Sequence, residues 1–147
     1  DYCRNSGVRL MLENGGSFNT AADLAEIIDE VNHPLLSAAY SLPVAAAAGD
    51  KIENGINVLG ERLVCLKCKD LKDGKPVAFG DGDLAAKATL QAAIKAGFSG
   101  NIVFEYDQAW LGTQQTDLDA VMKKSAHAIF ECLDPRAAAT RARTVKV

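Results

Sequence analysis

Residues 63–106 read LVCLKCKDLKDGKPVAFGDGDLAAKATLQAAIKAGFSGNIVFEY, a strand, a turn-rich connection, a helix and a second strand. The segments 63–68 and 102–106 are short apolar runs of the kind that form buried strands. Between them, from about 84 to 96, apolar side chains recur at helical spacing, and Gly97 follows as a typical helix terminator. Parallel strands need such a crossover helix, so this stretch predicts a β/α/β unit.

The same order of strand and helix occurs upstream of this unit. Residues 7–13 (GVRLMLE) and 35–42 (LLSAAYSL) predict two further strands. Thr20 is the expected N-cap of the helix after the first strand, and Asp50 starts the helix after the second. Asp117 is the expected cap of a last helix, downstream of residue 106. The chain therefore contains four predicted β/α units.

Four parallel β/α units make either a doubly wound sheet or part of a barrel. A closed (β/α)8 barrel usually needs about 250 residues, and this chain has 147. We expect an α/β fold with four β/α units of a (β/α)8 TIM barrel, as a half-barrel or the carboxyl-terminal half of a full barrel. The chain begins with Asp1 rather than Met, as a fragment or processed product would. Residues 1–133 form the predicted barrel portion, and 134–147 a basic, flexible tail.

Composition argues against several classes of partner. The net charge of −3 indicates neither a nucleic acid nor a membrane surface, and no apolar run reaches the length of a membrane span. Cys65 and Cys68 form a C-x-x-C inside a predicted strand, where residues three apart point to opposite faces. We therefore expect buried, reduced thiols rather than a metal or redox site, and a cytoplasmic protein.

Three stretches resemble one family. GVRLMLEN (7–14), LVCLKCKDLKDGKPVAFGDGDL (63–84) and AGFSGNIVFEYD (96–107) are similar to the second half of the xylose-isomerase-like TIM barrels, which include sugar phosphate isomerases and epimerases. The most specific part is K-D-x-x-x-G-K-x-V-x-x-G-x-G-D followed by G-x-x-G-x-x-x-x-E. The resemblance implies an isomerase or epimerase that acts on a small carbohydrate.

The resemblance also implies a divalent metal, Mg, Mn or Zn, held by side chains at the ends of four consecutive strands. Glu13 and Glu105 match the two family glutamates, whereas Tyr40 stands in place of an Asp and Lys67 in place of a His. A phenol ionises only near pH 10, and an ammonium has no lone pair to offer a metal. We expect a degenerate site without a bound metal; if one binds, Glu13 and Glu105 are its ligands.

Lys67 allows three interpretations. Its ammonium can bridge Glu13 and Glu105 and replace the metal electrostatically. Alternatively, the three side chains form a structural salt-bridge network that binds no substrate. Lys67 could also act as a base or Schiff-base amine, although flanking carboxylates would raise its pKa and oppose that role.

For an enzyme, Glu13 and Glu105 are the candidate acid/base residues, and Lys67 is the candidate stabiliser of an oxyanion. The side chains at or just beyond the strand ends that we expect to bind substrate are Asn14, Tyr40, Asp70 and Trp110. Asn14 could hydrogen-bond a sugar hydroxyl, and Trp110 could stack on a sugar face or pack against the last helix.

Two rival functions remain open: a non-catalytic homologue that binds a small carbohydrate, and a structural or assembly protein. A lone half-barrel would leave two bare strand edges, which rarely stay unpaired. We therefore expect a homodimer or a missing upstream half-barrel as the partner of these edges, and no nucleic acid or membrane partner.

Overall fold

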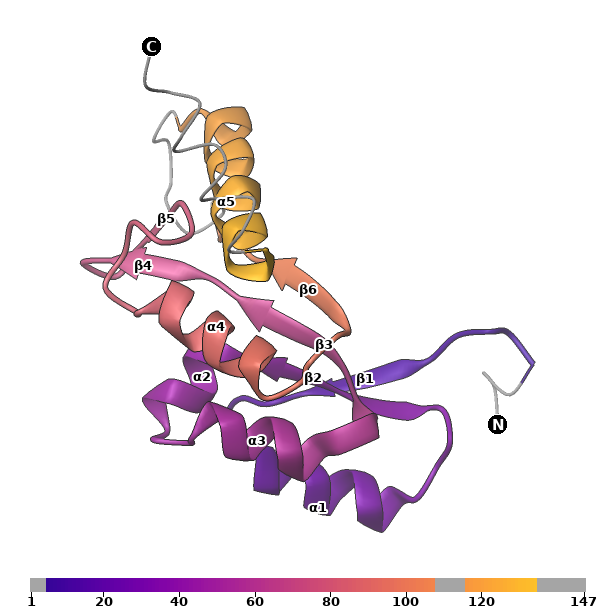
Figure 1. Cartoon of the computed structure of the whole chain (residues 1–147). Helices are drawn as coiled ribbons and strands as arrows, with labels where there is room; N and C mark the ends of the chain where they lie inside the picture. Colours follow the sequence, from indigo (N-terminus) through magenta and orange to yellow (C-terminus); the bar gives the residue numbers. More distant parts are fainter. Residues whose placement is uncertain (1–4, 108–115, 135–147) are drawn as a thin grey trace. The chain divides into compact units, whose positions relative to one another are not determined.

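A computed structural model describes residues 5–107 and 116–134 (Figure 1). Trp110 and the predicted basic tail from residue 135 onward lie outside the described residues. The elements in chain order are β1 (Leu10–Glu13), α1 (Ala21–Val31), β2 (Leu36–Ser41), α2 (Leu42–Ala47), α3 (Ile52–Leu59), η1 (Gly60–Arg62), β3 (Leu63–Cys68), β4 (Asp70–Lys72), β5 (Lys75–Val77), α4 (Ala86–Lys95), β6 (Asn101–Phe104) and α5 (Leu118–Leu133).

The main sheet has the strand order β1-β2-β3-β6. β1 pairs in parallel with β2, and β2 pairs in parallel with β3. Figure 1 shows α1 and α3 side by side on one face of this sheet. Strand and helix alternate along the chain, which confirms the prediction of a partial (β/α) barrel.

The predicted start of α1 at Thr20 is confirmed by its N-cap. The Thr20 hydroxyl accepts the Asp23 amide at 3.2 Å, and the Asp23 carboxylate accepts the Thr20 amide at 2.8 Å, forming a capping box. These backbone and side-chain bonds from Thr20 lower the pKa of Asp23. The helix ends at Asn32, whose left-handed backbone (φ 43°) is tolerated because asparagine visits this region more readily than most residues.

Two local features differ from the sequence-based expectation. Asp50 does not start α3; instead its carboxylate accepts the amide of Ala21 at 2.7 Å, where α1 begins. The connection after β3 contains an antiparallel hairpin of β4 and β5, turned by Asp73 and Gly74 with positive φ angles. Its strands have three residues each, too few for a recognisable alternation of apolar and polar residues.

The chain divides into two compact units. The described residues of the first unit are 5–68 and 92–103, and those of the second are 69–91, 104–107 and 116–134. The first unit contains β1, β2 and β3 with α1, α2 and α3, and its fully buried side chains include Leu24, Tyr40 and Leu66. In the second unit, Phe79 is fully buried and meets Phe104 edge to face at a centroid distance of 6.3 Å.

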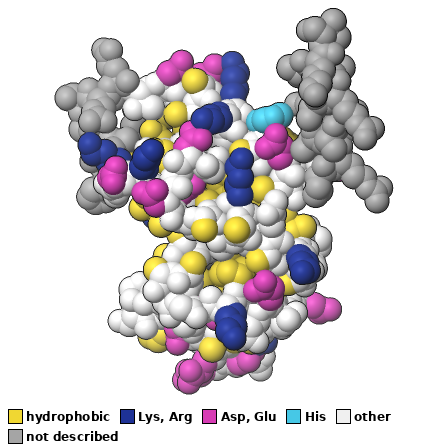
Figure 2. Space-filling model, turned by 60° about the vertical axis from the view of Figure 1, so that its left-hand side comes forward, with side chains coloured by type: hydrophobic (Ala, Val, Ile, Leu, Met, Phe, Trp, Pro, Cys, Tyr) yellow, Lys and Arg dark blue, Asp and Glu magenta, His cyan; other side chains and the backbone are white. Residues whose placement is uncertain are grey.

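Acidic and basic side chains are intermixed over the visible face in Figure 2. This distribution fits the small net charge of −3. Among the described residues, no helix has both the length and the apolar character that a membrane crossing requires.

Candidate functional site

An ion pair joins the carboxyl ends of two strands in the first unit. The Lys67 Nζ, on β3, lies 2.5 Å from Oε2 of Glu13, the last residue of β1. β2 lies between these strands, so the two side chains must span about 10 Å of sheet. Ala39 and Ser41 of β2 are opposite Glu13 and Lys67 in the pairing and are small enough to let the longer side chains meet.

The pairing of β2 with β3 puts Lys67 on the same face of the sheet as Glu13. The register shifts by one residue after Ala38, which pairs with Leu63, whereas Ala39 pairs with Cys65. Because side chains alternate between faces, this shift aligns Cys65 and Lys67 with the face that carries Glu13. Lys67 is 20% exposed and Glu13 38% exposed, so a solute can reach the pair.

Asn14 anchors the end of β1 to the end of β2. Its side chain is buried; Nδ2 donates to the Ser41 carbonyl at 3.1 Å and to the Asn19 carbonyl at 3.0 Å. Its Oδ1 accepts the Ser41 amide at 2.6 Å. These main-chain bonds hold the backbone next to Glu13, so the structure gives Asn14 a positioning role.

Tyr40 points away from the Glu13 face. It pairs with Leu66 in the sheet, and its fully buried side chain donates to Oδ2 of Asp50 at 2.7 Å. Its ring also lies against Gly55 of α3, on the helical side of the sheet. Burial, and then the hydrogen bond to Asp50, raise the pKa of Tyr40 above its ordinary value. The structure therefore separates Tyr40 from the Glu13–Lys67 pair.

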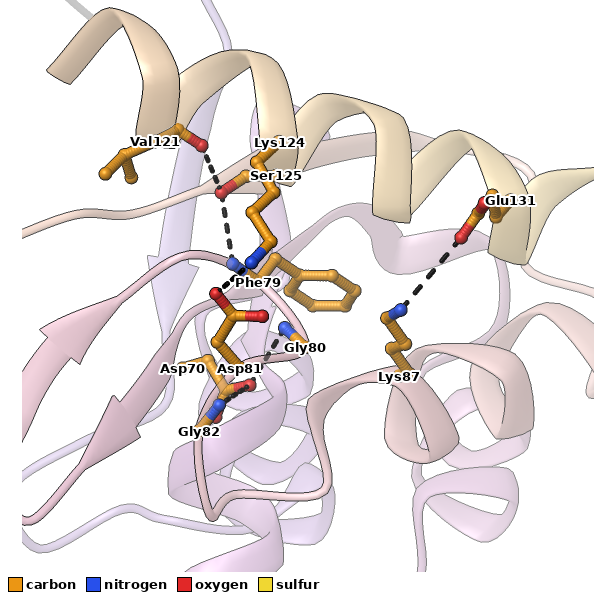
Figure 3. Close-up of polar contacts among 10 residues, drawn as sticks. All are labelled: Asp70, Phe79, Gly80, Asp81, Gly82, Lys87, Val121, Lys124, Ser125 and Glu131. Atoms are coloured by element: carbon orange, nitrogen blue, oxygen red, sulfur yellow. Dashed lines mark hydrogen bonds and ion pairs between the residues drawn. The ribbon is translucent and has the colours of Figure 1, made fainter. Parts of the chain in front are cut away.

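Asp70 organises a loop of the second unit (Figure 3). Its buried Oδ2 accepts the amides of Gly80 at 2.9 Å and Gly82 at 3.0 Å, and its Oδ1 accepts those of Leu71 at 3.1 Å and Leu84 at 3.3 Å. A Cβ at Gly82 would collide with this carboxylate, so the second glycine of the G-x-G motif permits the close approach. Asp70 thus holds the G-x-G loop together.

Helix α5 is tied to the same loop by a residue that the sequence interpretation missed. The Ser125 hydroxyl donates to the Val121 carbonyl at 2.7 Å and accepts the Phe79 amide at 3.0 Å (Figure 3). Lys124 also reaches Asp81 at 2.5 Å. A serine among the apolar positions of the last helix was the only signal of this role in the sequence.

Glu105 directly follows β6 and is half-buried within the second unit. Its expected bridge to Lys67 remains a prediction. Trp110, the other candidate near this strand end, lies outside the described residues.

The residues at the end of β1 do not fit the divalent metal that the family resemblance implies. One oxygen of Glu13 is already bound by the Lys67 ammonium, which repels a cation and offers it no lone pair. In the described part of the chain, no three His, Cys, Asp or Glu side chains come together as a metal-binding group. The remaining donor set is too small for the ligand number that Mg²⁺, Mn²⁺ or Zn²⁺ requires.

The buried cysteines lie where the alternation of the strand predicts. Cys65 shares the Glu13 face, and Cys68 points to the opposite face with its Sγ 3.5 Å from the Val103 carbonyl oxygen. Both are buried thiols, as is Cys132 of α5, whose pKa is raised by burial. This placement argues against a paired C-x-x-C site.

Comparison with solved structures finds barrels of twice the length. A D-allulose 3-epimerase from Methylomonas sp. in complex with D-allulose matches with a TM-score of 0.72 and 18% identity, over 88% of this chain and 50% of that one. An L-ribulose 3-epimerase matches with a TM-score of 0.70 and 18% identity, over 97% and 52%. The IOLI protein with a bound zinc atom matches with a TM-score of 0.67 and 20% identity, over 90% and 51%.

This chain therefore spans about half the length of the solved structures it matches. At these identities the likeness shows a shared fold. A sequence search of curated proteins finds no match. A family model described as "Xylose isomerase-like TIM barrel" matches residues 1–132, nearly the whole sequence. The chain belongs to the xylose isomerase-like TIM barrel family.

Proposed function

We propose that this chain contributes to a barrel that isomerises or epimerises a small sugar without a resident metal ion at Glu13. The observation that supports this function is the ion pair of Lys67 and Glu13, 2.5 Å apart at the carboxyl ends of β3 and β1. The carboxyl ends of the strands carry the chemistry in this type of barrel.

The proposed chemistry is a proton transfer next to a carbonyl group. Glu13 removes a proton from the carbon beside the carbonyl, and the electron pair of the broken C–H bond moves onto the carbonyl oxygen. Lys67 donates a hydrogen bond to the oxyanion that forms. The ammonium thereby stabilises the negative charge that a divalent metal ion would otherwise stabilise. Return of the proton to the opposite face of the same carbon gives an epimer. Return of the proton to the former carbonyl carbon gives an isomer, provided that the hydroxyl proton of the first carbon passes to the former carbonyl oxygen. Glu105 is the proposed second acid/base residue.

The proposed substrates are ketoses. Two of the similar structures are named for D-allulose and L-ribulose, in which a carbonyl adjoins the carbon that changes configuration. Asn14 and Asp70 enter the proposal as positioning residues because their polar atoms are bonded to main-chain groups. Tyr40 is left out since its hydroxyl bonds to Asp50, and Trp110 remains a candidate for stacking on the sugar. The proposed location is the cytoplasm, where thiols stay reduced.

Hydrogen exchange into the sugar tests the proposal directly. The chain is incubated in D2O with D-allulose or L-ribulose, with and without a chelator, and NMR follows replacement of C–H by C–D. We expect chelator-resistant exchange that falls by about 100-fold or more in Glu13→Gln and in Lys67→Met. Lys124→Met is the matched control because it breaks an ion pair of equal length elsewhere, with Asp81, and it should exchange like the wild type.

Two outcomes would decide against this function. Exchange that requires added Mn²⁺ would contradict the replacement of the metal by Lys67. Sugar-dependent NMR shifts at Glu13 and Lys67 without any C–D formation would instead support the rival function, a binding protein without catalysis. One observation favours this rival: the Glu13 carboxylate is already paired with a cation of the same chain, Lys67.

A further inference from the structure

Phe18 is an exposed aromatic side chain on the loop that joins β1 to α1. Its exposed fraction is 51%. Single exposed apolar side chains are common on protein surfaces, so exposure by itself assigns no role to the ring. What distinguishes Phe18 is its place just beyond the carboxyl end of β1, since the chemistry of this type of barrel occurs at that end of the strands.

Hydrogen bonds hold this loop in one conformation. Gly15 and Phe18 exchange two main-chain hydrogen bonds, with distances of 2.7 and 3.0 Å between the amide nitrogen and the carbonyl oxygen. The turn between them uses Gly16, whose φ of 59° lies in the left-handed region. The Asn19 side chain closes the turn by donating to the Gly16 carbonyl at 3.0 Å. The backbone that carries Phe18 is therefore preorganised, which reduces the entropy lost when a ligand binds to the ring.

The pairing of Gly15 with Phe18 puts the ring on the Glu13 face. Side chains alternate along the chain that continues β1, so position 15 shares the side of Glu13, while Asn14 points to the other side, where it is buried. Directly opposite residues of an antiparallel pair point to the same side, so Phe18 shares the side of position 15. The ring of Phe18 and the carboxylate of Glu13 thus lie on either side of Gly15, on one face.

The space above Gly15 is open. Within the described residues, a Cβ built at position 15 would have no neighbouring atom within 4 Å, and the same is true at Gly16. This space has an aromatic ring on one side and the Lys67–Glu13 ion pair on the other. A sugar needs both kinds of neighbour, because its C–H groups favour apolar surface and its hydroxyl and carbonyl groups need polar partners.

We propose that the ring of Phe18 packs against the C–H groups of the bound ketose, and that Gly15 leaves room for the sugar between this ring and Glu13. The inference rests on the function proposed above. The C–H groups away from the reacting carbon do not change in charge during the proton transfer, so the contact is equally strong in the ground state and in the transition state. Phe18 therefore sets the affinity for the sugar, while Glu13 and Lys67 set the rate of the chemical step.

The concentration dependence of deuterium exchange into D-allulose tests the contact. Phe18→Ala should raise KM by about tenfold and leave kcat within about twofold of the wild type, because it removes binding that is uniform along the reaction. Phe18→Tyr keeps the ring and should keep the KM of the wild type. Phe130→Ala is the matched control: it removes a ring that is 68% exposed on α5, in the second unit, and should change neither constant.

Gly15→Leu tests the open space without removing the ring. Gly15 is not among the residues with a positive φ, so its backbone accepts a side chain and the fold should be kept, as circular dichroism and the melting temperature would show. The leucine side chain would occupy the room left for the sugar. We therefore expect KM to rise by about tenfold or more.

The outcomes separate this contact from the proposed function. An unchanged KM in Phe18→Ala or in Gly15→Leu would overturn the contact and leave the function standing. A lower kcat together with a lower melting temperature in Phe18→Ala would assign the ring to the folding of the loop, and would overturn the contact as well. Calorimetric binding of D-allulose that Phe18→Ala weakens, without C–D formation in the wild type, would support the contact and contradict catalysis. A wild type that neither binds D-allulose nor exchanges its hydrogen would overturn both.

Discussion

The Tyr40 hydroxyl donates a 2.7 Å hydrogen bond to Oδ2 of Asp50, and the same oxygen accepts the Ala21 amide at 2.7 Å. One carboxylate thus joins β2, the start of α1 and the segment before α3. This arrangement gives Tyr40 a role in the packing of the first unit.

Replacing Tyr40 by Phe should destabilise the first unit. The change removes one hydrogen bond to a partly buried carboxylate while keeping the ring, so we expect a loss of about 1–2 kcal/mol. Urea unfolding followed by circular dichroism measures it. Tyr106→Phe, in the second unit, is the matched control. Equal stability of the wild type and Tyr40→Phe would show that the bond to Asp50 contributes nothing.

The contribution of Tyr40 should disappear at high pH. Burial and Asp50 raise the pKa of Tyr40 above its ordinary value of about 10. The stabilisation is therefore complete below about pH 10 and is lost as the pH rises further, because the unfolded chain then ionises its tyrosine while the folded chain does not. The difference in unfolding free energy between the wild type and Tyr40→Phe, measured from about pH 8 to about pH 11, should shrink above pH 10. A difference that grows over this range would contradict the assignment.

Gly55 should not tolerate a methyl group, although it lies inside α3. A Cβ there would meet the Tyr40 hydroxyl and would approach Cζ of the same ring to 2.9 Å. Alanine improves helix propensity by about 1 kcal/mol, but the collision should outweigh this gain and leave a net loss of about 1–2 kcal/mol. Asn57→Ala, at an exposed position of the same helix, should be neutral or stabilising in the same thermal unfolding experiment. In a Tyr40→Phe background the loss should be smaller, since the nearest atom is gone.

Lys67 should control the response to divalent metals. We expect no increase in the melting temperature of the wild type on addition of Mn²⁺, because the ammonium already occupies the Glu13 carboxylate. Lys67→His replaces that charge with a nitrogen ligand and should produce a Mn²⁺-dependent rise, detectable by differential scanning fluorimetry. Lys67→Met, which offers no ligand, separates metal binding from simple relief of charge. A rise in the wild type would overturn the role given to Lys67.

Asp70→Asn should loosen the G-x-G loop. The substitution keeps the shape of the side chain but exchanges one acceptor oxygen for a donor, so at least one of the four loop amides loses its partner. We expect a loss of about 1–3 kcal/mol, together with faster hydrogen exchange of residues 79–84. Asp81→Asn breaks only an exposed ion pair with Lys124 and should cost about 1 kcal/mol or less. Equal losses of unfolding free energy in the two variants would show that the buried hydrogen bonds of Asp70 stabilise the loop no more than the exposed ion pair of Asp81 does.

Local signals in the sequence predicted most elements correctly. The strand 63–68 has the predicted bounds, and the caps at Thr20 and Asp117 work as their residue types indicate. Each of these features depends on residues close in sequence. The roles of Asp70 and Ser125 were missed because the partners that define them are main-chain amides 10 to 46 residues away. A bond to a main-chain amide cannot be recognised from the residue type of its donor.

The sequence by itself determined the order of strands and helices, the parallel crossovers and the family, since apolar periodicity and short motifs carry that information. Only the tertiary structure decided which polar strand ends face one another. Because Glu13 pairs with Ala39, the next residue of β2, Tyr40, faces the helices. A shift of one residue in the pairing of β2 with β3 then puts Lys67 on the Glu13 face. Side chains alternate along a strand, so one step of register exchanges the two faces, and register depends on pairing between strands rather than on either strand alone.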